Sequence, residues 1–299
     1  MKGIARLSLA LQLQYLVGTS HGFVTSPSHH NHRNHDVISH SDAATFLASS
    51  SETTDATASN AQDDAVEVNP RKVGLALQLD DGTRKSHSMA QNTAFVTGFF
   101  KGLADRQSYG ALLKSLCFVY DAMEKAMDET DESRVQQLDL PALRRAASLK
   151  RDLQYFYGSG DLSNVQPSSA ASIYVARIEQ IAETKPYLLI AHQYTRYLGD
   201  LFGGQMMGGM ASSSLGLSNG DGTAFYEFDQ IPDTQAFITK WYKLLNALDL
   251  TDDQKQEIVD EANLVFDLNV GILQELEGSP MQAFITLVIN SFKARLGFA

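Results

Sequence analysis

The feature that most constrains the fold is a helical repeat of apolar residues that runs through most of the chain. From about residue 71 onward, apolar side chains recur at intervals of three and four, without the sustained alternation that indicates a half-buried strand. One such series consists of Leu112, Leu116, Tyr120, Met123 and Met127. This spacing places all its members on one face of a helix. The pattern predicts an all-α fold of about eight helices.

Residues that begin and end helices support this prediction. Prolines suited to a first helical turn and polar residues suited to the preceding cap are found at Pro141, Pro186, Pro280, Asp233 and Ser279. Thr251 and Gln254 have the spacing of a capping box. The helix that follows this box is expected to end before Gly278.

Charge and cysteine content exclude several classes of protein. The chain has a net charge of −11, whereas nucleic-acid binders concentrate Lys and Arg against phosphates. Its single cysteine, Cys117, cannot form an intrachain disulfide or a Cys-based zinc or iron–sulfur site. The sequence has no run of about 18 apolar residues. We therefore expect no nucleic-acid partner and no membrane span.

The N-terminal part reads as a leader in two segments. Residues 1–22 have early positive charge, a mildly apolar stretch and then small residues, which is the layout of a signal peptide. Residues 23–70 are rich in Ser, Thr, Ala and Asp and poor in large hydrophobics, which favours disorder. The combination resembles the two-part presequence of algae with secondary plastids and predicts delivery to the plastid stroma. A secreted protein with a disordered linker is the alternative, and in both cases residues 71–299 form the folded domain.

Histidine is distributed very unevenly. Six of the eight histidines fall in the leader, where they could form a metal-binding tract but have no rigid scaffold to hold one. Only His87 and His192 belong to the predicted domain. Any imidazole chemistry of the domain must therefore use one of these two.

The helix expected over 186–211 is unusually rich in glycine. Each glycine inside a helix costs up to about 1 kcal/mol relative to alanine, so five of them need a reason. Gly199 and Gly203 are four residues apart and expose bare backbone on one face. That strip could pack against a second helix or admit a ligand closely. The adjacent Asp200 favours a ligand site, because a carboxylate in an apolar helix needs hydrogen-bond partners.

The run AHQYTRYLGDLFGGQ at 191–205 resembles the signature of the haem oxygenase family. Further stretches similar to the family are HSMAQNTAFVTGFFKG at 87–102, LCFVYDAME at 116–124, DLQYFYG at 152–158, GTAFYEF at 222–228 and VDEANLVFDLN at 259–269. The resemblance covers about residues 75–278 and is strongest to the plastid and cyanobacterial branch. It implies a single domain in which haem lies between a proximal helix and a kinked, glycine-rich distal helix.

The resemblance also implies roles for individual residues. His87 matches the proximal iron ligand, whereas His192 matches a position that packs or hydrogen-bonds without binding iron. Gly199 and Gly203 match the glycines that bring the distal helix close to the haem face, and Asp200 matches a distal carboxylate that holds an ordered water. The hydrogen-bond network around that water is implied to include Tyr120, Arg196 and Asn269. The residues implied to line the pocket are Phe99, Phe266 and Tyr194.

Several positions depart from the family pattern. Asp80, Ile238 and Tyr242 stand where the family usually has basic side chains that pair with the haem propionates. Arg84 could partly substitute, whereas Lys240 and Lys243 are expected to point to different sides of their helix. A further departure is Gln91, which replaces a usual glutamate. These changes predict weaker haem binding or a looser orientation in the ring plane.

The function that the resemblance implies is oxidative cleavage of haem, as both cofactor and substrate, to biliverdin, carbon monoxide and ferrous iron. Dioxygen and electrons are required, and in a plastid the electron donor is expected to be ferredoxin. Because ferredoxins are acidic, a local basic patch is expected, with Arg71, Lys72, Arg84 and Lys85 as candidates. The alternatives are a related protein that binds haem or another tetrapyrrole without degrading it, and a helical enzyme acting on another small molecule.

Overall fold

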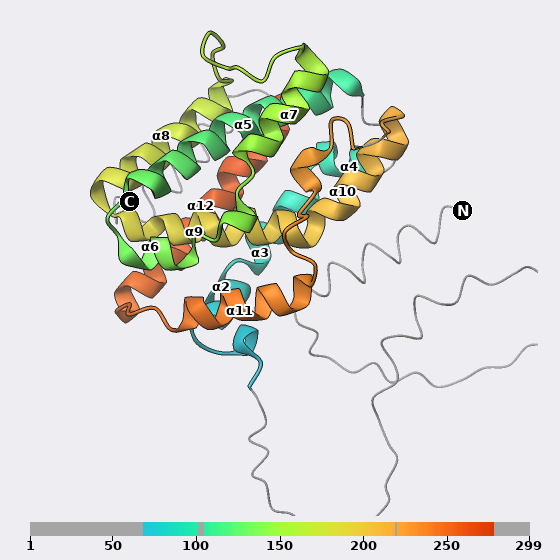
Figure 1. Cartoon of the computed structure of the whole chain (residues 1–299). Coiled ribbons are helices and arrows are strands. Elements are labelled where there is room, and N and C mark those ends of the chain that lie inside the picture. Colours follow the sequence, from blue (N-terminus) through green and yellow to red (C-terminus); the bar gives the residue numbers. More distant parts are fainter. Residues whose placement is uncertain (1–67, 101–104, 219, 278–299) are drawn as a thin grey trace, which may run out of the picture. The chain divides into compact units, whose positions relative to one another are not determined.

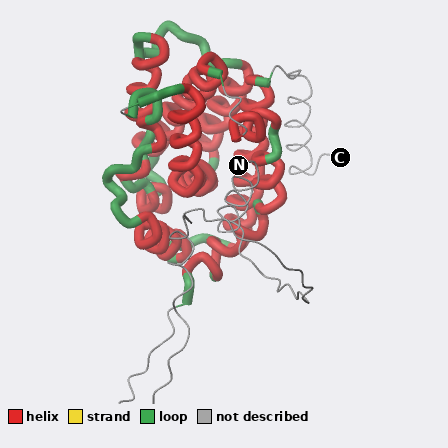
Figure 2. Tube along the Cα trace, turned by 90° about the vertical axis from the view of Figure 1, so that its right-hand side faces the viewer, coloured by secondary structure: helices red, strands yellow, loops and turns green. Residues whose placement is uncertain are grey.

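The fold was analysed in a computed structural model that describes residues 68–100, 105–218 and 220–277, with no side-chain description at 99 and 100. Within these ranges every regular element is helical, as Figure 2 shows, which confirms the all-α prediction. The α-helices are α2 (Gly74–Gly82), α3 (Arg84–Gln91), α4 (Ala94–Phe100), α5 (Arg106–Glu129), α6 (Ser133–Leu138), α7 (Ala146–Tyr157), α8 (Ser169–Thr184), α9 (Leu189–His192), α10 (Gly199–Leu215), α11 (Thr234–Asn246) and α12 (Asp252–Leu276).

Short 3₁₀ turns and one π-helical segment complete the described part. The 3₁₀ turns are η2 (Pro70–Lys72), η3 (Pro141–Leu143), η4 (Pro186–Leu188) and η6 (Ala224–Tyr226), and the π-helix is η5 (Gln193–Leu198). The described part therefore has more α-helical segments than the expected eight or so. Several of them are only one or two turns long, and α2 and α3 are separated by Thr83 alone.

The long helices α5 and α12 organise the core (Figure 1). α5 packs against α7 and α8, and α12 packs against α2, α3, α8 and α9. The apolar series predicted on α5, from Leu112 to Met127, is buried throughout. This confirms that the three-and-four spacing marks a core-facing surface.

The predicted helix boundaries are found where the structure describes them. Thr251 Oγ1 accepts from the Gln254 backbone N–H at 3.2 Å, and the Gln254 side chain accepts from the Thr251 N–H at 3.1 Å, which completes the capping box. Asp233 caps α11, and Pro141 and Pro186 begin 3₁₀ turns. The predictions for 278–280 lie outside the described residues.

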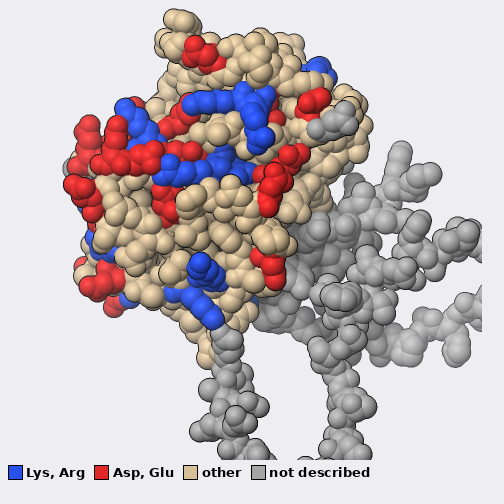
Figure 3. Space-filling view, viewed as in Figure 1, with Lys and Arg blue, Asp and Glu red and all other residues tan. Residues whose placement is uncertain are grey.

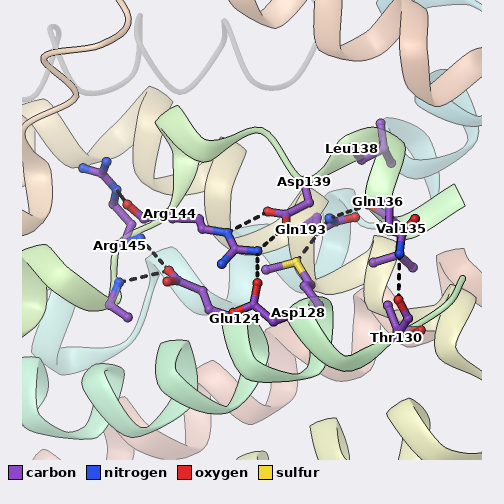
Figure 4. Close-up of polar contacts among 12 residues, drawn as sticks. Glu124, Asp128, Thr130, Val135, Gln136, Leu138, Asp139, Arg144, Arg145 and Gln193 are labelled. Carbon is purple, nitrogen blue, oxygen red and sulfur yellow. Dashed lines mark hydrogen bonds and ion pairs between the residues drawn. The ribbon is translucent and has the colours of Figure 1, made fainter. Parts of the chain in front are cut away.

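A polar cluster ties the C-terminal end of α5 to η3 and α7 (Figure 4). Arg144 donates to Asp128 at 2.7 Å and to Asp139 at 3.1 Å. Glu124 accepts the backbone N–H groups of Arg145 and Ala146 at 2.6 and 2.9 Å. These bonds fix the start of α7, because they satisfy N–H groups that a helix leaves without internal partners.

The glycine-rich segment is helical without a break from Pro186 to Leu215, through η4, α9, η5 and α10. It ends at Leu215, four residues later than expected, and is followed by Gly216, whose φ of 64° is the left-handed conformation typical of a helix C-cap. The hydrogen-bond pattern widens to a π-helix over Gln193–Leu198, immediately before Gly199. Such segments are a known cause of kinks and often mark functional sites. The Gln193 side chain anchors this segment by donating to Val135 O at 3.1 Å (Figure 4).

The predicted leader, residues 1–22 and 23–70, lies outside the described residues up to position 67. Its targeting role and the boundary of the domain at residue 71 stay predictions. Within the described ranges, no helix combines the length and the apolar character needed to cross a bilayer.

Candidate functional site

A cavity of about 410 Å³ lies between α3, α10 and α12, with further walls from η5, α11 and the η6 turn. Its apolar lining includes Val96, Leu116, Leu198, Phe202, Met206, Met207, Phe266, Ile272 and Leu273. Polar groups enter at a few points only, which is the usual character of a small-molecule site. The predicted site residues His87, Gly199, Gly203, Asp200, Arg196, Asn269, Tyr194 and Arg84 all border this cavity.

His87 on α3 presents an imidazole to the cavity. Its ring meets Phe266 edge-on, with centroids 5.5 Å apart and planes at 86°. Gln91, one turn later, donates its side-chain N–H to His87 Nε2 at 3.1 Å. Burial lowers the pKa of His87, and Asp80 offsets part of that shift. The imidazole is therefore neutral at physiological pH, which is the form that binds a metal ion.

The glycines of α10 divide between two faces of the helix. A Cβ added to Gly199 or Gly203 would meet nothing within 4 Å, and both residues border the cavity. A Cβ added to Gly204 or Gly208 would come within 2.9 Å of the Tyr226 side chain. Both explanations of the glycines therefore apply, each to a different pair. One pair leaves room in the cavity, and the other allows Tyr226 to pack closely.

Asp200 is held in a network of buried side chains beside the bare strip of α10. Tyr120 on α5 donates its hydroxyl to Asp200 Oδ2. Arg196 Nη2 lies 3.2 Å from Asp200 Oδ1, and Arg196 Nη1 donates to Asn269 Oδ1 at 2.7 Å. Asn269 in turn donates to Val265 O at 2.7 Å. The four residues that the sequence placed in one network are in contact.

The electrostatics of this network favour a carboxyl group that can take up a proton. Burial raises the pKa of Asp200, and the Arg196 guanidinium and the Tyr120 hydroxyl offset only part of this shift. Burial also raises the pKa of Tyr120, so that its hydroxyl stays protonated as a donor. A carboxyl with a raised pKa beside a cavity is typical of groups that hold or pass protons.

Two buried residues without a predicted role, Arg145 and Asp152, hold the η6 turn, and this turn packs against α10. Asp152 accepts the backbone N–H groups of Ala224 and Phe225, each at 2.8 Å. Arg145 is almost fully buried, donates to backbone carbonyls of the turn, and lies 3.9 Å from the centre of the Phe228 ring. The stretches around Asp152 and Tyr226 resemble the family, but the sequence indicated no role for either residue. A charged residue within an otherwise apolar helical repeat was the signal available for Asp152.

His192 lies in the core and does not appear in the cavity lining. Its Nε2 is 3.2 Å from Glu261 Oε1, and Arg177 Nε donates to the same carboxylate at 3.0 Å. This placement agrees with the expected packing or hydrogen-bonding role.

The positions that depart from the family pattern have different surroundings, and two of them lie at one rim of the cavity. Ile238 is buried in the core. Tyr242 borders the cavity, as does Asp80, which pairs with Arg71. Arg84 also borders the cavity but is half exposed and pairs with Asp81 at 2.5 Å. The side chain of Phe99, predicted to line the pocket, lies outside the described residues.

The lining fits a flat, largely apolar ligand that carries a metal ion. A neutral imidazole borders the cavity on α3, and α10 borders it with Gly199 and Gly203, where no side chain fills the space, so the cavity has room for a flat ring. Over the described ranges, no group of three or more His, Cys, Asp or Glu side chains is placed to hold a metal ion. Over the described residues, the fold and site define an all-helical protein with a largely apolar cleft that one neutral imidazole borders.

Comparison with known proteins identifies the family. The family model described as heme oxygenase matches residues 73–275, which is more than half of the chain. The protein therefore belongs to the haem oxygenase family.

The similar proteins include several of algal and cyanobacterial origin. Heme oxygenase of Guillardia theta is 45% identical over 217 residues, covering 72% of this chain and 92% of the relative. Heme oxygenase 1 of Synechocystis is 45% identical over 224 residues, covering 75% and 93%. The crystal structure of the Synechocystis heme oxygenase-1 in complex with heme superposes with a TM-score of 0.66, covering 74% of this chain and 100% of that chain.

Proposed function

We propose that the protein is a haem oxygenase, which cleaves haem with dioxygen and electrons to biliverdin, carbon monoxide and ferrous iron. The observation that carries this proposal is the arrangement of one cavity with His87 on one wall and Gly199, Gly203 and Asp200 on another. The heme-bound Synechocystis relative supports the choice of ligand. A separate metal site on the protein is not needed.

When bound, haem supplies both the iron at which dioxygen is reduced and the ring that is opened. His87 would hold the iron through the neutral imidazole that its burial favours. Gly199 and Gly203 leave the backbone of α10 bare toward the cavity, so a bound haem could approach it closely. Phe266 and Tyr194 would contribute to the lining of the haem pocket.

Asp200 is the residue that positions and transfers the proton in the proposed reaction. Its carboxylate is held by Tyr120 and Arg196, so it can position a water over the ligand and pass a proton through it. Asn269 fixes Arg196 from behind. Tyr120, Arg196 and Asn269 are thus positioning residues: they hold the Asp200 carboxylate in one orientation, which fixes the direction in which it passes the proton.

We further propose ferredoxin as the electron donor. Ferredoxins are acidic, whereas the chain is itself acidic, so docking needs a local basic surface. On the face seen in Figure 3, acidic side chains gather at the left edge, Lys and Arg side chains form a band across the upper half, and a smaller basic group lies lower in the view, over α11. Lys72, Arg84 and Lys85, all exposed, extend the supply of positive charge near the rim of the cavity. If another electron donor supports haem turnover and ferredoxin does not, the proposal of ferredoxin as the donor is overturned.

The plastid stroma is the proposed location, with residues 1–22 and 23–70 as a two-part presequence and 71–299 as the catalytic domain. The algal and cyanobacterial relatives support it, and the product there would feed bilin chromophores. Fusing residues 1–70 to a fluorescent protein in an alga with a secondary plastid tests it. Fluorescence in the secretory pathway or outside the cell would contradict it.

The proposed activity is tested by titrating haemin into the purified full-length chain and recording the absorption spectrum before and after adding reduced ferredoxin in air. A Soret band that decays while a biliverdin band grows is the expected result. A stable Soret band would favour the second candidate, a haem-binding protein without cleavage activity. That candidate is favoured by Asp80, Ile238 and Tyr242, where the family usually has basic side chains. Failure to form a Soret band would contradict both.

A further inference from the structure

An ion pair lies at the rim of the cavity where the family usually has a single basic side chain. Asp80 on α2 is 7% exposed, and its Oδ1 is 2.6 Å from Arg71 Nη2. The Arg71 side chain is 13% exposed, and both residues border the cavity. Arg71 precedes residues 73–275, the range that the family model matches. A guanidinium is therefore present at this rim, but it comes from a different part of the backbone.

The η2 turn that carries Arg71 is fixed to the rest of the fold. The Asn246 side chain, at the end of α11, donates to Pro70 O at 2.6 Å and accepts from the Ala76 N–H at 3.0 Å. The Asn69 side chain caps the turn by accepting the Arg71 N–H at 3.0 Å. η2 is thereby clamped between α2 and α11, and the ion pair with Asp80 holds the Arg71 side chain at the cavity rim.

The charges at this rim suit a carboxylate on the ligand. Asp80 alone would repel such a group, but its charge is balanced by Arg71. A guanidinium presents five N–H donors in a planar fork, so it can bind a protein carboxylate and a ligand carboxylate together. Tyr242, which borders the cavity on the same side, has a pKa raised to about 12 by burial and stays a neutral donor.

We propose that Arg71, oriented by Asp80, binds a propionate of haem in place of the basic side chain that the family usually has at position 80. This inference rests on the proposed function, because it takes haem as the ligand. Arg71 is the binding residue, and Asp80 is a positioning residue. The anchor for the haem edge has thus moved upstream along the chain while staying at the same rim of the cavity.

The test compares haem with its dimethyl ester, in which both propionates are blocked, by absorption titration of the ferric complexes. Arg71→Ala is expected to weaken haem binding at least about tenfold, the typical loss for a charge-assisted hydrogen bond. Binding of the ester is expected to change less than about threefold on the same scale. Arg151→Ala, which removes an exposed arginine on α7, is the matched control and should leave both affinities unchanged.

A double variant tests whether the positive charge can be moved from position 71 to position 80. Asp80→Arg combined with Arg71→Ala places the cation at position 80 and should restore most of the haem affinity lost in Arg71→Ala. Equal loss of haem and ester affinity in Arg71→Ala would overturn the proposal, because it would assign Arg71 to packing of η2. No recovery in the double variant would also count against it. If the unmodified chain forms no haem complex, the proposed function itself fails, which is a distinct result.

Discussion

The distal wall and the rim of the cavity differ in how closely they follow the family. On the wall formed by α10, Gly199, Gly203 and Asp200 border the cavity. Asp200 contacts Tyr120 and Arg196 directly and is linked to Asn269 through Arg196. At the rim, the positions where the family usually has basic side chains hold Asp80 and Tyr242, and Arg71, from outside the matched range, pairs with Asp80. In the proposed function, proton delivery depends on the fixed positions of Asp200 and its hydrogen-bond partners. Binding of a haem propionate depends only on a positive charge close to the rim, wherever in the sequence it comes from.

Removal of the axial imidazole is expected to have the largest effect. His87→Ala should lower biliverdin formation more than about 100-fold, since even residues that support a metal ligand contribute 10–100-fold. The absorption spectrum should lose the features of an imidazole complex and recover them when free imidazole is added. Biliverdin formation at an unchanged rate in His87→Ala, without imidazole, would assign the ligand elsewhere.

The distal carboxylate should affect chemistry without affecting binding. Asp200→Asn keeps the size of the side chain but removes its ability to pass a proton, so biliverdin formation should fall about 100-fold or more. Haem affinity, measured by titration, should stay within about threefold of the unmodified chain. A large loss of affinity with unchanged turnover of bound haem would reverse the roles of the distal wall and the rim.

The two pairs of glycines should respond in opposite ways. Gly203→Ala places a methyl in open space and removes a helix-destabilising residue, so unfolding should cost up to about 1 kcal/mol more while haem binds less well. Gly208→Ala brings a methyl against Tyr226 and should destabilise the fold by about 1–3 kcal/mol. Chemical denaturation and haem titration of both variants separate the two effects. The same sign of stability change in both would refute the division of faces.

The smallest effect on the cavity is expected from a buried ion pair behind it. Burial alone would raise the pKa of Glu261, but hydrogen bonds from His192 and Arg177 lower it to about 2. The stability that this carboxylate contributes is therefore full above its unfolded pKa of about 4.3 and is lost as pH falls toward 2. Glu261→Gln should flatten the decline in unfolding free energy between pH 5 and 3. A decline as steep as in the unmodified chain would exclude Glu261 as its source.

The sequence predicted the fold class, and most of the residues it proposed for the site border the cavity. The helical repeat located the buried face of α5, and the motif at 191–205 placed Gly199 and Asp200 beside the cavity. These features depend on local spacing. The role of Asp80 could not be predicted in this way, because its partner Arg71 is directed by a hydrogen bond between Asn246 and Pro70, 176 residues apart in the chain. The π-helical turn of η5 likewise depends on tertiary contacts such as that of Gln193 with Val135.

Tyr226 packs closely on Gly204 and Gly208 and so limits how far α10 can move toward the η6 turn. Tyr226 belongs to the η6 turn, whose backbone is held by hydrogen bonds to Asp152, so its own position is fixed as well. The position of α10 beside the cavity therefore depends on an aromatic ring of the η6 turn, which also borders the cavity. Through the N–H groups of Ala224 and Phe225, it depends in turn on the Asp152 carboxylate of α7.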